Sequence, residues 1–346
     1  WQGVLLSGSH LTIAEESIID EICSSLAFKN YDHIITDFDI NRRIENHTLM
    51  ADIELIEISD KNGDFNKIIE SKITTFTSGT TSKPKKITRR YQYYKQASVE
   101  FVNHMSISDY KIKTIATFSG MYLGSIFNLF ILPYSCSWDL IIPDKKGIMF
   151  WGNLNKYINN YNLNLIWATP GIINTLIKIN FRIDIKKSID LIFLSGTDHL
   201  SYNTWKEFRN IAKVPLLNTY GLSETLFISA QAKNEYKTYS TGKLLKDIEV
   251  SFRKIKNSEI KLKDEKYKQS EFSELLVKTP YFCDEVKKNL TKDSFFNTGD
   301  LAKPVKFSNR ELNIFGRSKD IIIKGGINIS PNYIESLLIQ NKDIND

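Results

Sequence analysis

The residues best suited to chemistry in this sequence form a stretch rich in hydroxyls and lysines, Thr75–Lys86, which reads TFTSGTTSKPKK. A glycine among threonines and serines allows a tight turn whose backbone N–H groups and hydroxyls point at one anion. Lys83 and Lys85 can add charge-assisted hydrogen bonds to phosphate. The nucleotide P-loop pattern GxxxxGK[ST] does not fit, because Pro84 stands where its second glycine would be. Taken alone, the stretch is either a phosphate-binding loop or a basic surface turn.

A second stretch, NTYGLSET at Asn218–Thr225, follows an apolar run that is typical of a buried strand. Asn218 can hydrogen-bond the edge of a base, and Tyr220 offers a flat ring beside it. Gly221 permits a tight turn. Glu224 supplies a carboxylate of the kind that holds Mg²⁺ together with phosphate oxygens. The same residues also suit an ordinary turn with a solvated glutamate.

Two further motifs follow towards the C-terminus. In NTGDLA, residues 297–302, a glycine precedes Asp300 in a turn that can present the carboxylate to both hydroxyls of a ribose. In GRSKDIIIKGGINISPNYIE, Gly316–Glu335, an arginine in a turn is followed by a strand, paired glycines and a helix start. Each motif is common by itself, and the occurrence of all four in one order argues against chance.

Alternating strands and helices must position these motifs. Apolar runs typical of buried strands occur at 111–118, 163–170, 188–196 and 214–221, and helical patterns occur at Arg89–His104, Gly171–Ile179 and Ser201–Ala212. This alternation predicts a mainly parallel sheet with helices on both faces. Ligands of such sheets bind at the carboxyl ends of the strands, where the Gly- and Pro-marked loops of this sequence lie.

The pattern changes from about Tyr239 onwards. Period-two strands within 247–263 and 273–280 predict a small antiparallel barrel or sheet. A strand, a turn and a helix starting near Pro331 then begin a last unit. We therefore predict an α/β fold with a large domain over 1–316, a β-rich subdomain over about 240–316, and a hinge with the start of a small α+β C-terminal domain over 317–346.

Composition narrows the functional classes. The chain is 42% hydrophobic and 25% charged, as in ordinary globular proteins. Its net charge of +6 suits an anionic ligand but is too diffuse for a nucleic-acid footprint, and no nucleic-acid-binding motif occurs. The scattered cysteines Cys23, Cys136 and Cys283 favour free thiols in a reducing cytoplasm.

One apolar segment is long enough to cross a membrane. Residues Ile115–Tyr134 carry no charge over 20 positions. The segment also contains Gly120, Gly124 and Pro133 among several polar residues, which favours a buried strand followed by a helix. We therefore predict no membrane span.

The four motifs together resemble those of the adenylate-forming (AMP-binding) enzymes, which include acyl- and aryl-CoA ligases, carrier-protein ligases and adenylation domains. The phosphate loop of that superfamily reads roughly TSGTTGxPKG, and Thr77–Lys86 reads TSGTTSKPKK. Its YGxTE and TGD motifs resemble Tyr220–Glu224 and Thr298–Asp300. Its late motif is matched by Gly316, Arg317, Lys319, Asp320, Gly325, Gly326, Ile329, Pro331, Ile334 and Glu335. The resemblance extends from about residue 74 to the end.

The resemblance implies roles for individual residues. Those expected at the ATP phosphates are Thr77, Ser78, Gly79, Thr80, Thr81, Lys83, Lys85 and Ser223, and those expected at adenine and ribose are Asn218, Tyr220, Gly221, Asp300 and Arg317. Glu224 would hold Mg²⁺, Lys319 would lie at a domain hinge, and Glu224, Thr77 and Lys85 would serve catalysis. The acid pocket would include Phe118, Met121, Tyr122, Trp167 and Gly196, the last within the SGTD segment Ser195–Asp198.

The implied reaction joins a carboxylic acid to ATP as an acyl-adenylate and then transfers the acyl group to CoA or to the phosphopantetheine of a carrier protein. Ser82 and Lys86 replace glycines of the phosphate loop, and Gly120 and Met121 stand where the family often has a histidine or an aromatic residue. No aspartate in that segment could pair with an α-ammonium group, which favours an acyl or aryl acid over an amino acid. The family's late catalytic lysine would lie beyond Asp346. A non-catalytic protein that binds a nucleotide or an acyl-adenylate is the alternative.

Overall fold

The computed structural model describes residues 11–12, 71–77, 85–118, 123–143, 148–254, 273–291, 294–304, 310–320, 322–324, 327–329 and 331. The chain divides into two compact units, one of residues 1–92 and 119–125 and one of residues 93–118 and 126–346. The α/β architecture predicted from the sequence is confirmed in the second unit.

The first unit contains a three-stranded sheet. β1 (Leu11–Thr12) runs parallel to β2 (Lys72–Thr77), which pairs antiparallel with β3 (Lys85–Arg90). Ile73 and Ile87 are buried, and the buried hydroxyls of Thr74 and Thr88 share a hydrogen bond of 3.1 Å. The predicted phosphate loop therefore begins on one strand of a hairpin and ends on the other, while residues 78–84 lie outside the described residues.

The second unit is built on a seven-stranded sheet in the order β10-β9-β8-β7-β6-β4-β5. Its strands are β4 (Lys113–Ile115), β5 (Asp139–Ile141), β6 (Leu165–Ala168), β7 (Ile192–Ser195), β8 (Leu216–Leu222), β9 (Leu226–Ala230) and β10 (Lys243–Leu244). The five strands from β8 to β5 are parallel to one another. β9 pairs antiparallel with β8, and β10 pairs antiparallel with β9. Each of the four predicted buried strands is present, although shorter than its apolar run.

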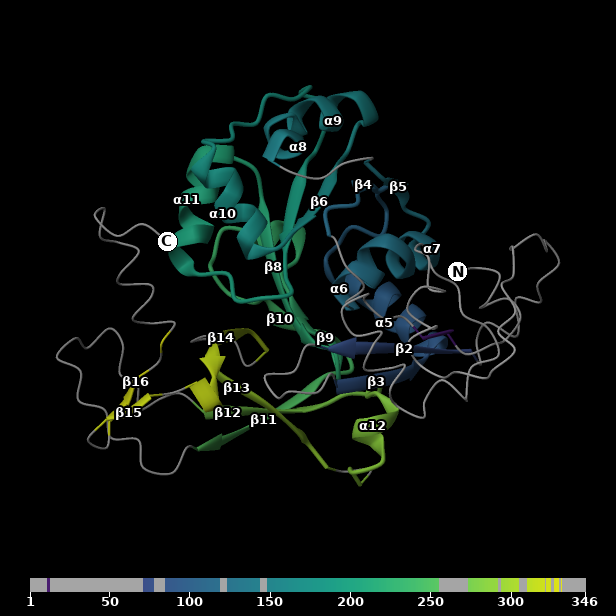
Figure 1. The fold of residues 1–346 in the computed structure, drawn as a ribbon, viewed down its shortest axis with the longest axis vertical. Coiled ribbons are helices and arrows are strands. Elements are labelled where there is room, and N and C mark those ends of the chain that lie inside the picture. The colour runs from purple at the N-terminus through teal and green to yellow at the C-terminus, as the bar shows by residue number, and fades with distance from the viewer. Residues whose placement is uncertain are drawn as a thin grey trace, which may run out of the picture. The chain divides into compact units, whose positions relative to one another are not determined.

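One face of this sheet is covered by α8 (Ile148–Gly152), α9 (Leu154–Tyr161), α10 (Pro170–Lys178) and α11 (Tyr202–Ala212) (Figure 1). Alternate strand residues such as Ile166 and Phe193 pack into that core with Leu176 and Phe208 from the helices. α10 begins where the Thr169 hydroxyl accepts from the Ile172 amide, and Ser201 caps α11 in the same way. Both predicted helices are confirmed to within one residue at each end.

The opposite face carries α5 (Tyr91–His104), the π-helical turn η2 (Phe127–Ile131) and α7 (Leu132–Cys136) (Figure 1). α6 (Leu123–Ile126) precedes η2 along the chain. α5 begins two residues later than predicted, because Arg89 and Arg90 pair with β2 as part of β3. Phe101 of α5 stacks on Phe227 of β9 with ring centroids 3.9 Å apart, so aromatic side chains fill this side of the core.

The uncharged run 115–134 is divided among separate elements. It contains the last residue of β4 and the short helical turns that start at Leu123, with residues 119–122 outside the described part. Within the residues that the structure describes, no helix is long and apolar enough to cross a membrane. The run is apolar because Phe118, Ile126, Phe127 and Ile131 are core residues.

The second unit also holds a four-stranded antiparallel sheet of β11 (Glu249–Lys254), β12 (Ser273–Lys278), β13 (Phe296–Pro304) and β14 (Leu312–Arg317). α12 (Asp284–Lys287) lies between β12 and β13. A bridge between Lys243 and Glu311 and a hydrogen bond from the Arg310 guanidinium to the Leu245 carbonyl join this sheet to the larger one. The antiparallel β-rich region predicted after Tyr239 is confirmed.

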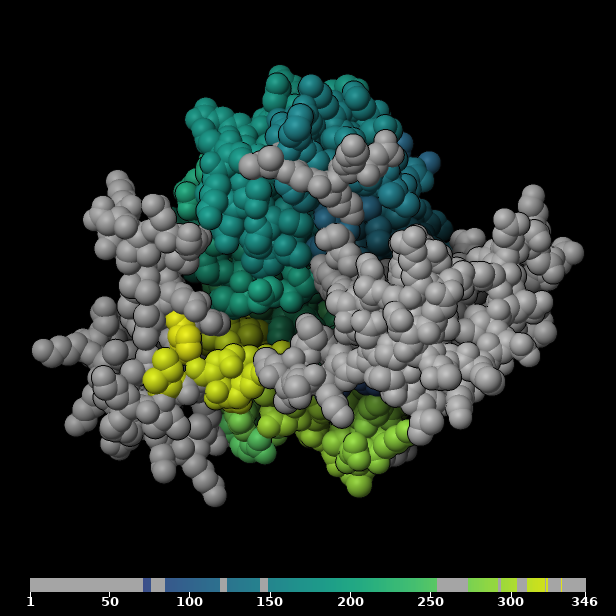
Figure 2. Space-filling view, viewed as in Figure 1, coloured from purple at the N-terminus to yellow at the C-terminus, as the bar shows by residue number. Residues whose placement is uncertain are grey.

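After β14 come the 3₁₀ turn η6 (Ser318–Asp320) and the hairpin of β15 (Ile322–Lys324) and β16 (Ile327–Ile329). In Figure 2 these last segments, coloured yellow, lie on the visible surface. The helix predicted from about Pro331 falls almost wholly outside the described residues. The domain limits predicted near residues 240 and 316 stay predictions.

Candidate nucleotide site

The Asn218–Glu224 segment is the end of a central strand. β8 starts with the buried Leu216 and Leu217, has a bulge between Tyr220 and Gly221, and ends at Leu222, after which residues 223–225 turn the chain back into β9. A Cβ on Gly221 would lie 2.3 Å from the backbone oxygen of Leu226, so only glycine lets the two strands approach this closely. The hairpin therefore brings Tyr220 and Glu224 to the side of the sheet where the carboxyl ends of the parallel strands lie.

Three predicted residues from distant segments meet at the carboxyl ends of these strands. The Tyr220 hydroxyl donates to Asp300 Oδ2 at 2.5 Å, and Arg317 Nε pairs with Asp300 Oδ1 at 2.8 Å. The register of β13 and β14 places Asp300 directly opposite Arg317. Both oxygens of this nearly buried carboxylate thus have a donor, and the phenol and the guanidinium are held in fixed directions.

The TGD motif fixes Asp300 through its threonine. The Thr298 hydroxyl donates to the Leu275 carbonyl at 2.8 Å and accepts from the Asp300 amide at 3.0 Å. Gly299 has a φ of +72°, a conformation that favours glycine. Arg317 Nη1 also donates to the Thr298 carbonyl at 3.3 Å. Thr298 thus holds the backbone of Asp300, a contact for which the sequence motif gave no expectation.

The electrostatics of the three residues follow from burial. Burial raises the pKa of Asp300 above its ordinary value of 3.8, whereas the Tyr220 hydrogen bond and the Arg317 charge oppose the rise. Burial, and then the Asp300 carboxylate, raise the pKa of Tyr220 well above its ordinary value of 10.0. The phenol therefore keeps its proton at neutral pH and acts as the donor.

Glu224 lies close to this group, in the turn between β8 and β9. Its negative charge adds to the rise in the pKa of Asp300. The turn is closed by the Thr225 amide, which donates to the Leu222 carbonyl at 3.1 Å. Glu224 is half-buried, as is Ser223 beside it.

Glu224 offers one half-buried carboxylate, which suits a magnesium ion that arrives with a nucleotide. Among the described residues, no group of three or more His, Cys, Asp or Glu side chains could hold a metal by itself. Mg²⁺ commonly takes one or two protein carboxylates and completes its shell with phosphate oxygens and water. Glu224 is the residue that would contribute such a carboxylate here.

The remaining adenine and acid-pocket residues lie on the neighbouring strands. Asn218 is 4% exposed. Its amide donates to the side-chain oxygen of Gln231, and its carbonyl accepts from the Gln231 amide. Gly196 follows β7, and a Cβ there would lie 2.8 Å from Thr219 Cγ2 and 3.4 Å from Trp167 Nε1. Phe118 packs edge-on against Trp167 with ring centroids 5.6 Å apart.

The structure thus brings Phe118, Trp167 and Gly196 together. Trp167 Nε1 is buried and has no hydrogen-bond partner within the described part of the chain. Met121 and Tyr122, which were predicted to belong to the same pocket, lie outside the described residues.

The structure describes only some of the residues predicted to bind phosphate or to form the hinge. Thr77 and Lys85 are paired residues at the ends of β2 and β3 in the first unit, and the Lys85 side chain is exposed. Ser78, Gly79, Thr80, Thr81 and Lys83 lie outside the described residues. Lys319 is exposed in η6, directly after Arg317 and Ser318.

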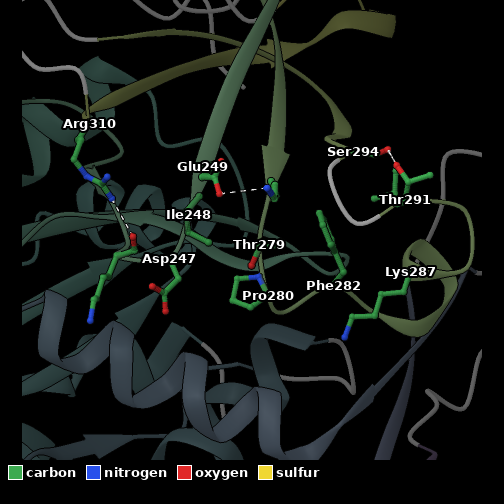
Figure 3. A pocket seen from close by; sticks show the side chains of 13 residues that line it. Asp247, Ile248, Glu249, Thr279, Pro280, Phe282, Lys287, Thr291, Ser294 and Arg310 are labelled. Carbon is green, nitrogen blue, oxygen red and sulfur yellow. Dashed lines mark hydrogen bonds and ion pairs between the residues drawn. The ribbon is translucent and has the colours of Figure 1, made fainter.

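A cavity of about 640 Å³ lies elsewhere in the second unit, between α12 and the ends of β11 and β12 (Figure 3). Its lining is formed by Lys246, Asp247, Ile248, Glu249, Lys278, Thr279, Pro280, Phe282, Lys287, Leu290, Thr291, Ser294 and Arg310. Lys278 pairs with Glu249 at 3.5 Å, and Arg310 donates to backbone carbonyls, so these cations already have partners within the protein. The cavity contains none of the predicted nucleotide-binding residues, and no sequence motif marks it.

Comparison with known proteins identifies the family. The family model described as AMP-binding enzyme matches residues 71–282, which is more than half of the chain. The chain belongs to the AMP-binding enzyme family. This confirms the resemblance that the four sequence motifs indicated.

Among the relatives of this chain is an uncharacterized acyl-CoA ligase, YhfT, of Bacillus subtilis, 24% identical over 76% of this chain and 52% of the relative. A putative long chain fatty acid-CoA ligase, VraA, of Staphylococcus epidermidis is 26% identical over 78% of this chain and 55% of the relative. The chain thus spans about half the length of these curated relatives.

Solved structures share the fold. The o-succinylbenzoate CoA synthetase of Bacillus subtilis in complex with the acyl-adenylate OSB-AMP has a TM-score of 0.70 at 17% identity, over 99% of this chain and 77% of that one. The anthranilate CoA ligase AuaEII in complex with anthranoyl-AMP has a TM-score of 0.68 at 14% identity, over 99% and 76%.

Proposed function

We propose that the whole protein activates a carboxylic acid with ATP as an acyl-adenylate, with release of pyrophosphate, and then passes the acyl group to the thiol of CoA. Membership of the AMP-binding enzyme family supports the nucleotide chemistry, and relatives named as acyl-CoA ligases support CoA as the acceptor. An acyl or aryl acid is the proposed substrate class.

The observation that carries the proposal is the contact of Tyr220, Asp300 and Arg317. A buried carboxylate held by a phenol and a guanidinium at the strand ends is suited to accept hydrogen bonds from ribose hydroxyls. Glu224, which acts electrostatically on Asp300, would hold Mg²⁺ against the phosphates. Thr77 and Lys85, with residues 78–81 and Lys83 between them, would bind the phosphates.

The chemistry asks mainly for positioning and charge neutralisation. An acid carboxylate attacks the α-phosphorus of ATP, the bond to the pyrophosphate oxygen breaks, and pyrophosphate leaves. This chain's residues would orient the nucleotide and offset its charge, because phosphoryl transfer needs little covalent help from a protein. Phe118, Trp167 and Gly196 would form part of the wall against which the acid lies, together with Met121 and Tyr122.

The test is ATP–pyrophosphate exchange by the full-length protein with Mg²⁺ and pooled fatty and aromatic acids. Exchange that depends on an acid and is lost in Glu224→Ala would support the proposal. ATP binding without exchange in any acid pool would contradict it and favour the alternative, a non-catalytic nucleotide- or acyl-adenylate-binding protein. Replacing CoA with a phosphopantetheinylated carrier protein in the second step tests which thiol is used.

A further inference from the structure

The turn that carries Glu224 is held from outside its own hairpin. The backbone N–H of Cys283 donates to the backbone oxygen of Glu224 at 3.1 Å. Cys283 is fully buried and immediately precedes α12. The position of the Glu224 backbone therefore depends on where residues 281–283 lie.

That segment is in turn fastened to α5. The Tyr281 hydroxyl donates to Glu100 Oε2 at 2.8 Å, and Glu100 Oε1 accepts from the Asp247 amide at 3.3 Å. On the other side of Cys283, Lys287 Nζ lies 3.9 Å from the centre of the Tyr93 ring. Two side-chain contacts, from Tyr281 before Cys283 and from Lys287 after it, thus join residues 281–287 to a single helix.

The Tyr281 contact is well placed to transmit position. Tyr281 is 5% exposed, so its ring is packed and its hydroxyl has little access to water. Burial, reinforced by the hydrogen bond to Glu100, raises the pKa of Tyr281, so the phenol remains a donor throughout the neutral range. This hydrogen bond is part-buried, and a hydrogen bond to a charged group is among the stronger polar contacts in proteins.

We propose that Tyr281, through its hydrogen bond to Glu100, is a positioning residue that sets the Glu224 turn for the binding of Mg²⁺ and ATP. The proposal rests on the proposed function for the role of Glu224. Residues that hold a metal-binding carboxylate in place commonly alter metal affinity when they are changed, although they do not touch the ion.

The first test needs no ligand. Tyr281→Phe keeps the ring and removes one hydroxyl, so amide hydrogen exchange in peptides covering residues 222–226 should become about fivefold faster than in the wild type. Tyr239→Phe is the matched control, because it removes another part-buried hydroxyl, one that donates to the Leu200 carbonyl at 2.6 Å. The control should leave exchange in these peptides unchanged.

The second test measures the magnesium dependence of ATP–pyrophosphate exchange. Tyr281→Phe should raise the Mg²⁺ concentration for half-maximal rate about tenfold, with a smaller effect at saturating Mg²⁺. Glu100→Leu removes the same hydrogen bond from the α5 side and should reproduce both changes. Glu100→Gln keeps an oxygen that can accept from Tyr281 and should restore much of the wild-type behaviour.

The outcomes separate the two proposals. Unchanged amide exchange at residues 222–226 in Tyr281→Phe, or unchanged magnesium dependence in an active protein, would overturn the positioning role. A wild type that exchanges no pyrophosphate with any acid would overturn the proposed function instead, and amide exchange would still decide whether Tyr281 holds the turn.

Discussion

At the scale of single residues, Asp300 is held through both of its carboxylate oxygens. Its pKa is raised by burial and lowered by two donors, Tyr220 and Arg317. The balance sets the pH below which the carboxylate binds a proton, so that one of its two oxygens would no longer accept a hydrogen bond from the proposed ribose. That pH lies above the ordinary value of 3.8, because the net shift is upwards.

Tyr220→Phe should move the acidic limit of ATP binding to higher pH. The substitution removes a hydrogen bond that lowers the pKa of Asp300, so the carboxyl group should bind its proton at a higher pH than in the wild type. Calorimetric titration with ATP at a series of pH values measures the shift. Tyr239→Phe again serves as the control, and a limit that stays in place in Tyr220→Phe would argue that Asp300 does not contact the nucleotide.

At the scale of elements, the β8–β9 hairpin combines a packing requirement with a functional one. The backbone oxygen of Leu226 occupies the space that a side chain at Gly221 would need, and Leu226 itself has a φ of +64°. Tyr220 and Glu224 lie on either side of this close approach, so the geometry of the turn determines the direction of both side chains.

Gly221→Ala should lower the free energy of unfolding by about 1–3 kcal/mol, because the new Cβ would lie 2.3 Å from a backbone atom that no rotamer change can move. Gly152→Ala, at the end of α8, places its Cβ where no atom lies within 4 Å and should change stability by less than about 1 kcal/mol. Urea unfolding followed by circular dichroism measures both. Equal stabilities of the two variants would contradict the close approach of β8 and β9.

The elements themselves were largely predictable from sequence, and the contacts between them were not. Apolar runs with Gly- or Pro-marked ends located β6, β7 and β8, since burial on both faces leaves a continuous apolar pattern. The start of α5 was predicted inside β3, because Arg89 is charged yet fully buried and gives no strand pattern. The hydrogen bond between the backbones of Cys283 and Glu224 could not be predicted from the sequence, because every residue except proline has a backbone N–H donor.

At the scale of the whole molecule, the order of the motifs carried more information than any one of them. Tyr220 and Asp300 are common residues in common motifs, and only the shared family pattern predicted that both would bind one nucleotide. The hydrogen bond between them depends on the packing of the four-stranded sheet against the larger one, which no local pattern encodes. The cavity beside α12 went unpredicted for the same reason, since its lining comes from several separate segments.

Binding of ATP to this assembled site should stabilise the second unit as a whole. A ligand that binds only the folded state at about 100 times its dissociation constant adds about 2.7 kcal/mol to the free energy of unfolding. Asp300→Asn should lose most of this gain, because it removes the charge that faces Arg317 and one of the acceptors proposed for ribose. Asp190→Asn is a charge-matched control, since Asp190 is an exposed carboxylate paired with Lys233, and exposed pairs contribute little.

Thermal unfolding with and without ATP and Mg²⁺ measures the gain for each protein. An equal gain in Asp300→Asn and Asp190→Asn would place the nucleotide away from Asp300, and no gain in the wild type would remove the nucleotide site from this part of the chain.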